Sequence, residues 1–173
     1  QFDFFMFNDG GDAILLDCHA DQVKALQGML TMYKLRSAVD IQPDERSVTV
    51  VWEDDTLSGF YTDPRLPAAG ARGYGLNIDS TASEDDYALH CLKLGLPEGG
   101  LDMIPQRSAM LVSNMDVLNA VSFEKGCYMG QELTARTHFR GLVKRRLVPF
   151  TYDGDIDAGQ TLYSGASKCG EVR

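Results

Sequence analysis

The sequence predicts an α+β fold in which helices pack on antiparallel sheets. Three patterns support this class: two adjacent strand-like runs open the chain, an amphipathic helix follows, and short strands come next, giving a ββαβ order. The 173 residues, of which 44% are hydrophobic and 24% charged, are typical of a globular protein with one ordinary domain or two small ones. This composition excludes a mostly disordered chain, a collagen-like repeat and a coiled coil.

The first part of the chain predicts a β-hairpin followed by a helix. Residues 2–7 and 13–17 are rich in strand-forming side chains, and the glycine and Asx residues of 8–12 suit a reversal of the chain. From 20 to 36 the apolar residues recur at spacings of three and four, as they do on the buried face of an amphipathic helix. We therefore expect an antiparallel pair of strands with a helix packed on it.

Shorter elements are predicted over the middle of the chain. Strands are expected at 39–42 and 47–52, on either side of a Pro-Asp turn. The stretch 53–75 is rich in proline, glycine and alanine and predicts loops around short strands. Residues 83–94 open with Ser-x-x-Asp, a capping arrangement, and therefore predict a second helix.

The last part of the chain predicts the beginning of another domain. Residues 142–152, followed by an Asp-Gly-Asp turn and the apolar pair 162–163, have the spacing of a β-sheet module, so we expect a second domain to begin near Val143. The chain opens on a strand-like run without an initiator methionine, and 170–173 resemble the start of a further strand. We expect the sequence to be a fragment of a longer protein.

The charge distribution points to a local anion site on an acidic chain. Sixteen basic and 25 acidic residues give a net charge of −9, which argues against duplex nucleic acid or an anionic membrane as partner. Between Arg136 and Arg146, however, five basic residues occur without an acid, which leaves a net charge of −14 for the rest of the chain. Uncharged apolar runs stay far shorter than the roughly 20 residues of a membrane-spanning helix.

The cysteines and histidines do not predict a bound metal. Neither the cysteines nor the histidines have the close sequence spacing of zinc or iron–sulfur ligands, and no CxxC pair occurs. The residues are Cys18, Cys91, Cys127, Cys169, His19, His90 and His138. A chain of this size with an ordinary core also has no need of disulfides, so we expect a reducing compartment.

One segment combines groups that are seldom found together in a protein core. Residues 125–136 read KGCYMGQELTAR and hold a thiol, an ammonium, an amide, a carboxylate and a guanidinium beside two glycines. A helix opening at Gly130, together with Lys125, would favour the thiolate of Cys127 and make it the reactive cysteine. The alternative that stays open is a small buried cysteine in a tight turn.

This segment resembles the signature of the YgfZ family. The resemblance rests on 121–132, continues to Arg136 and the Arg140-Gly141 pair, and extends backward through 114–116 and the GLPEGG string at 95–100. The family comprises folate-binding proteins related in fold to the T-protein, the aminomethyltransferase of the glycine cleavage system. It includes the mitochondrial iron–sulfur assembly factors.

The resemblance implies a T-protein-like fold in three parts. Residues 1–45 would form the ββαβ part of a folate-binding-like region, 46–142 a central α+β region with the KGCYxGQE motif, and 143–173 the start of a C-terminal β-barrel domain. The implied function is assembly or repair of four-iron four-sulfur clusters, with iron–sulfur assembly proteins and client enzymes as partners. The implied compartment is the cytoplasm of a bacterium or the mitochondrial matrix of a eukaryote.

The resemblance also implies a set of site residues. Cys127 is the signature thiol, with Lys125 beside it, and tetrahydrofolate is the expected cofactor. The residues expected to contact it are Asn114, Tyr128, Gln131, Glu132, Arg136, Arg140, Lys144 and Arg145. One departure is Val112, which stands where an acidic residue would grip the pterin in the T-protein relatives.

Two other functions remain open at this point. The first is a tetrahydrofolate-dependent one-carbon transferase like the T-protein, and the second is a ligand-free interaction module whose basic stretch docks acidic partners. The family signature implies no established turnover reaction, so whether the protein is an enzyme is left undecided.

Overall fold

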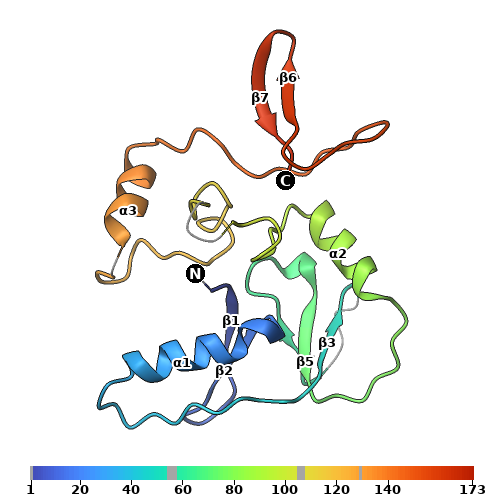
Figure 1. Ribbon diagram of the computed structural model, residues 1–173. Coiled ribbons are helices and arrows are strands. Elements are labelled where there is room, and N and C mark those ends of the chain that lie inside the picture. Colours follow the sequence, from blue (N-terminus) through green and yellow to red (C-terminus); the bar gives the residue numbers. More distant parts are fainter. Residues whose placement is uncertain (1, 54–57, 105–107, 129) are drawn as a thin grey trace.

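The computed structural model describes residues 2–53, 58–104, 108–128 and 130–173 (Figure 1). In this part of the chain the protein is mixed α/β, with three α-helices and small antiparallel sheets. None of the described helices is long and apolar enough to cross a membrane. The helix-and-antiparallel-sheet class predicted from the sequence is therefore confirmed in these coarse terms.

The predicted hairpin is present. Strand β1 (Phe4–Asn8) pairs antiparallel with β2 (Ile14–Cys18), and Phe4 lies opposite Cys18. The turn is closed by a hydrogen bond of 3.1 Å from the Asp9 amide to the Ala13 carbonyl, and Gly10 adopts a φ of 87° that suits glycine. The glycine-rich sequence between the strands thus fixes their register.

Helix α1 (Val23–Tyr33) follows a 3₁₀ turn at Ala20–Gln22, as the apolar spacing predicts, and buries Leu26. The predicted strand at 39–42 is wrong, because this segment joins no sheet. Instead, the Gln27 side chain donates to the Ile41 carbonyl at 3.1 Å, and the Lys34 ammonium donates to the Val39 carbonyl. Side chains from the preceding helix and its C-cap therefore donate the hydrogen bonds that these backbone carbonyls would otherwise accept from a neighbouring strand.

The second sheet contains three short strands in the order β3-β5-β4. These are β3 (Val48–Val51), β4 (Tyr61–Thr62) and β5 (Ala71–Tyr74), all antiparallel, with a 3₁₀ turn at Pro67–Ala69 before β5. Gly70 has a φ of 95°, and a Cβ atom there would lie 2.0 Å from the Val51 carbonyl oxygen. Only glycine allows this close approach. The strand predicted at 47–52 and the short strands predicted within 53–75 are confirmed for the described residues.

The hairpin and the second sheet are joined by aromatic and cationic side chains. Phe7 is buried, with its ring centroid 5.0 Å from that of Tyr61. The Phe5 ring lies between two guanidiniums, with the Arg65 and Arg72 carbons 4.7 and 4.2 Å from its centroid. Cation–π contacts of this kind are strongest where water is excluded. Together they position β1 against the sheet.

The second predicted helix is α2 (Glu84–Lys93), and its start is a complete capping box. The Ser83 hydroxyl accepts from the Asp86 amide, and the Asp86 carboxylate accepts from the Ser83 amide at 2.8 Å. Tyr87 packs against Trp52 at 5.4 Å, which ties α2 to the end of β3.

The remaining elements are α3 (Gln131–Phe139) and a C-terminal hairpin of β6 (Thr161–Ser164) with β7 (Ser167–Glu171). Figure 1 shows them on the side of the molecule away from α1. Residues 142–152, expected to belong to a sheet, form no strand. This segment is held to the rest of the chain by isolated hydrogen bonds, such as the one that the Leu147 amide donates to the Val112 carbonyl at 2.9 Å. The domain boundary near Val143 stays a prediction.

Candidate functional site

The KGCYxGQE segment is organised by the start of α3. Gly130 precedes the helix in the left-handed conformation, with a φ of 88° that favours glycine. The Gln131 side chain accepts from the Tyr128 amide at 3.0 Å, and the Gln131 amide donates to the Tyr128 carbonyl at 3.3 Å. The helix predicted to open at Gly130 is confirmed, and Gln131, expected to be a folate ligand, holds the turn before it.

Cys127 is exposed immediately before this turn, three residues ahead of Gly130. The open alternative of a buried cysteine is therefore wrong, because the sulfur belongs to the protein surface. The ammonium of Lys125 lies 5.0 Å from the centroid of the Tyr128 ring, a cation–π arrangement. Within the described residues, no hydrogen bond joins Lys125 to Cys127. The lysine is thus directed at the tyrosine ring.

Tyr128 presents a polar atom that the protein itself does not satisfy. Its hydroxyl is buried and has no hydrogen-bond partner among the residues that the structure describes. A buried hydroxyl without a partner costs free energy, so such an atom is a candidate contact for a bound group.

Asn114, another expected folate contact, has a structural role. Its backbone is left-handed with a φ of 60°, and its amide group donates to the Leu147 carbonyl at 2.7 Å. Next to it, the Arg146 guanidinium donates to both carboxylate oxygens of Asp116, one of them at 2.8 Å, and to the Leu111 carbonyl at 2.9 Å. These contacts clamp the segment after α3 onto 111–116.

Sequence reasoning missed the carboxylate of Asp116. Its side chain is largely covered, and the hydrogen bond from Arg146 is the main reason why the pKa of Asp116 lies below its usual value. The available signal was the Asn-x-Asp spacing of 114–116, close to the valine at position 112 where an acid was expected. Asp116 is occupied by Arg146, so it does not replace the missing acid as a free pterin ligand.

The four other basic residues of the 136–146 stretch are exposed. They form no ion pair within the part of the chain that the structure describes, and they are Arg136, Arg140, Lys144 and Arg145. Glu132, on the first turn of α3, is likewise exposed. The basic residues of the 136–146 stretch other than Arg146 are therefore available at the surface.

These residues fit only part of a tetrahydrofolate. The exposed guanidiniums and ammonium suit the carboxylates of its glutamate end, and the unsatisfied Tyr128 hydroxyl could take a hydrogen bond. For the pterin half, the carboxylate of Asp116 is occupied by Arg146, and Val112 and Asn114 carry none. No chemical step is therefore assigned to folate.

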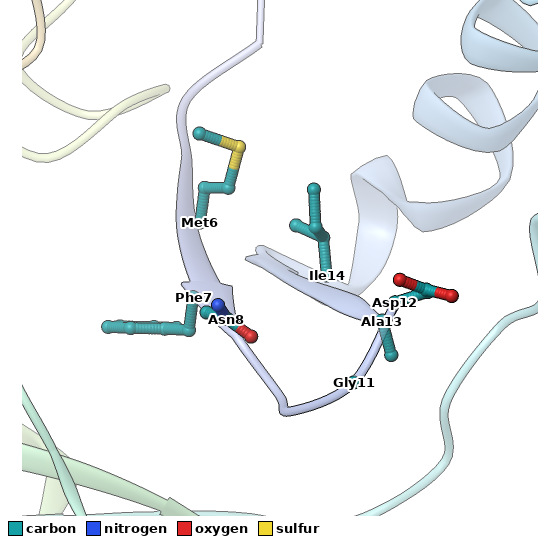
Figure 2. A pocket seen from close by; sticks show the side chains of 7 residues that line it. All are labelled: Met6, Phe7, Asn8, Gly11, Asp12, Ala13 and Ile14. Carbon is teal, nitrogen blue, oxygen red and sulfur yellow. The ribbon is translucent and has the colours of Figure 1, made fainter.

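A cavity of about 360 Å³ lies elsewhere, at the tip of the β1–β2 hairpin (Figure 2). Met6 and Ile14 point to the same side of the hairpin there, whereas Phe7 points away from them. None of the predicted site residues lines this cavity. Within the described residues, no group of three His, Cys, Asp or Glu side chains could hold a metal ion.

The exposure of the four cysteines leads to a reactivity prediction. We expect iodoacetamide to modify Cys127 faster than Cys18 and Cys91, which are partly covered. Burial, aided by the charge of Asp17, raises the pKa of Cys18 and slows its reaction further. Cys169 is also exposed but lies in the β6–β7 hairpin, so it is the matched comparison.

Mass spectrometry of the native protein after short exposure to the reagent measures these rates. Faster modification of Cys127 than of Cys169 would show that the motif activates the thiol. If Cys127 reacts no faster than the other three cysteines, the chemical basis for its role is removed.

The chain was also compared with known proteins. No protein-family model matches it. It is 36% identical over 168 residues to the mitochondrial iron–sulfur cluster assembly factor IBA57 homologue of Neurospora crassa, an alignment that covers 81% of this chain and 38% of that protein. It is 34% identical over 172 residues to the mitochondrial assembly factor IBA57 of Mus musculus, covering 87% and 48%, and 34% identical over 160 residues to that of Homo sapiens, covering 80% and 45%. The chain spans less than half the length of these relatives.

Proposed function

Because the chain belongs to the YgfZ family of T-protein-like proteins, which includes the IBA57 assembly factors, we propose that it acts in the assembly of iron–sulfur clusters. The observation that carries this proposal is the exposure of Cys127 in the segment before α3. Thiolates are the usual protein ligands of iron–sulfur clusters, and an exposed one can meet a cluster held by another protein. The cluster is the cargo of this reaction, and the cysteine is the group that touches it.

The relatives support proposals about the protein's compartment and its complete fold. The three relatives above are named as mitochondrial proteins, and we propose the same compartment for this chain. We also propose that the mixed α/β arrangement is part of a T-protein-like fold, with the β6–β7 hairpin belonging to a C-terminal barrel-like domain. The partners would be iron–sulfur assembly proteins and four-iron four-sulfur client enzymes.

Loss of the protein tests the proposed function. Deletion of its gene is expected to lower the activity of four-iron four-sulfur enzymes, most strongly in the presence of an oxidant, because clusters lost to oxidation must be rebuilt. Enzymes without such clusters are the control, and their activities are expected to stay normal. Equal loss in both groups of enzymes, or no loss in either, would contradict the proposal.

Tetrahydrofolate is proposed as a cofactor on the strength of the family and of the basic residues beside the motif. Replacing Lys144 and Arg145 with alanine is expected to lower the affinity for folate polyglutamate more than the affinity for folate monoglutamate. The reason is that each added glutamate brings another carboxylate to these charges. Calorimetry with both ligands, at low and high salt, measures the difference. Arg36 and Lys93, which are also exposed, provide a matched double alanine control.

The salt dependence is expected to become smaller in the Lys144 and Arg145 variant and to stay unchanged in the control. If both folates lose affinity equally, or neither does, these residues do not bind the glutamate end.

A further inference from the structure

We infer that one face of α3, together with Arg140 and Leu142 just after the helix, forms a docking surface. Its partner would be a protein segment that carries both acidic and apolar side chains. The α3 surface consists of Leu133, Arg136, Arg140 and Leu142. The inference deepens the proposed function, since it assigns the chemistry of a partner of the protein. It rests on that function for its biological meaning. Its physical basis is independent of any cluster.

The helix has too few internal contacts to account for its own stability. It is nine residues long and contains no buried residue. Isolated helices shorter than about 12–15 residues are marginal in water, and helices in proteins gain most of their stability from packing an apolar face. On the side facing the motif, the ring of His138 stacks on Phe123 with the centroids 3.7 Å apart. The Phe139 ring also meets Phe123, edge to face, with the centroids 5.8 Å apart. The face that carries Leu133, Arg136 and Arg140 is exposed.

This exposed face combines apolar and basic groups. Leu133 keeps 72% of its surface exposed, and Leu142, just after the helix, keeps 49%. Leu133, Arg136 and Arg140 follow at i, i+3 and i+7, so they lie along one face of the helix. Single exposed hydrophobic residues are ordinary, but two leucines that flank two unpaired guanidiniums indicate an interaction surface.

The charges decide what kind of partner fits. Arg136 and Arg140 have no ion-pair partner within the described residues, whereas the chain outside the 136–146 stretch carries a net charge of −14. An anionic bilayer would meet this negative charge over a wide area and be repelled. A single acidic segment with leucine-like side chains can pair with both guanidiniums and cover the apolar residues.

A binding measurement on the purified full-length protein tests this inference. The probe is a short fluorescent peptide with leucine and glutamate at helical spacing, and the comparison peptide has glutamine in place of every glutamate. We expect the acidic peptide to bind with an affinity that falls as salt is added, and the glutamine peptide to bind much more weakly. Arg136→Gln with Arg140→Gln is expected to weaken binding of the acidic peptide about fivefold to tenfold, as the loss of two exposed ion pairs implies.

Two further variants separate the surface from general effects. Leu133→Ala is expected to weaken the binding of both peptides, because it removes apolar contact area. Lys24→Gln with Lys93→Gln changes the net charge equally at exposed sites on α1 and α2, and it is expected to leave binding unchanged. Equal losses in this control and in the arginine variant would overturn the inference, because they would reflect net charge alone.

Other occupants would be recognised by the same variants. Tighter binding to vesicles of phosphatidylserine and phosphatidylcholine than to the peptide, lost in the arginine variant, would overturn the inference in favour of a membrane. Self-association lost in that variant would overturn it in favour of a second copy, and absence of peptide binding would overturn it outright. Because no cluster or client enzyme is present, these results are independent of whether the proposed function holds.

Discussion

Replacing Asp63 with alanine is expected to lower the free energy of unfolding by about 3–5 kcal/mol, because it leaves a mostly buried guanidinium without its partner. Asp63 is only 2% exposed, and its carboxylate lies 2.8 Å from a terminal nitrogen of Arg65. The same carboxylate accepts from the Arg65 amide at 2.9 Å. The substitution therefore removes the ion pair and a contact that shapes the loop before β5.

Arg65 cannot escape the cost by losing its proton. Burial alone would lower the pKa of this guanidinium, but the hydrogen bond and charge of Asp63 outweigh burial and raise it. Arginine remains charged at any pH at which the protein is folded. In the variant the cation would stay against the Phe5 ring with no carboxylate beside it, and the contact between hairpin and sheet would weaken.

Urea unfolding followed by circular dichroism measures the effect. The control is Asp44→Ala, which removes the exposed carboxylate that lies 2.6 Å from Arg46, and it is expected to cost only a small fraction of the loss at Asp63. A second variant, Asp63→Leu with Arg65→Met, replaces both charges by apolar groups and is expected to be more stable than Asp63→Ala. Equal stability of the Asp44 and Asp63 alanine variants would contradict this account of the core.

The elements that the sequence predicts well are those decided by neighbouring residues. The hairpin depends on the turn around Gly10, helix α2 on the capping box of Ser83 and Asp86, and the start of α3 on the left-handed Gly130. In each case the chemistry that ends or begins the element lies within a few residues of it. The exception is the segment 39–42, which has strand-like residues but meets no neighbouring strand.

Contacts between distant residues could not be predicted in this way. Asp17 accepts from Arg72 at 3.0 Å and from the Tyr74 hydroxyl at 2.9 Å, across more than fifty residues of sequence. Burial, followed by the charge of Asp17, raises the pKa of that tyrosine. No local pattern distinguishes this half-buried aspartate from an exposed one.

The candidate site shows the same division. Its thiol and its helix start were predictable from the motif, because the glycines set the local backbone. The roles of Asn114 and Arg146 were not, because each is fixed by a partner some thirty residues away. Residues that the family resemblance assigned to folate therefore include one that the structure uses to hold the chain together.

The comparison of Cys127→Ala with Cys169→Ala tests the proposed role of the thiol most directly. Both cysteines are exposed, so either change is expected to cost little stability, and both proteins should accumulate equally. In a strain lacking the gene and exposed to an oxidant, Cys169→Ala is expected to restore four-iron four-sulfur enzyme activity to the level given by the unaltered protein. Cys127→Ala is expected to leave that activity at the level of the deletion. Full restoration by Cys127→Ala at matched expression would show that the exposed thiol is not the functional group and would contradict the proposed mechanism.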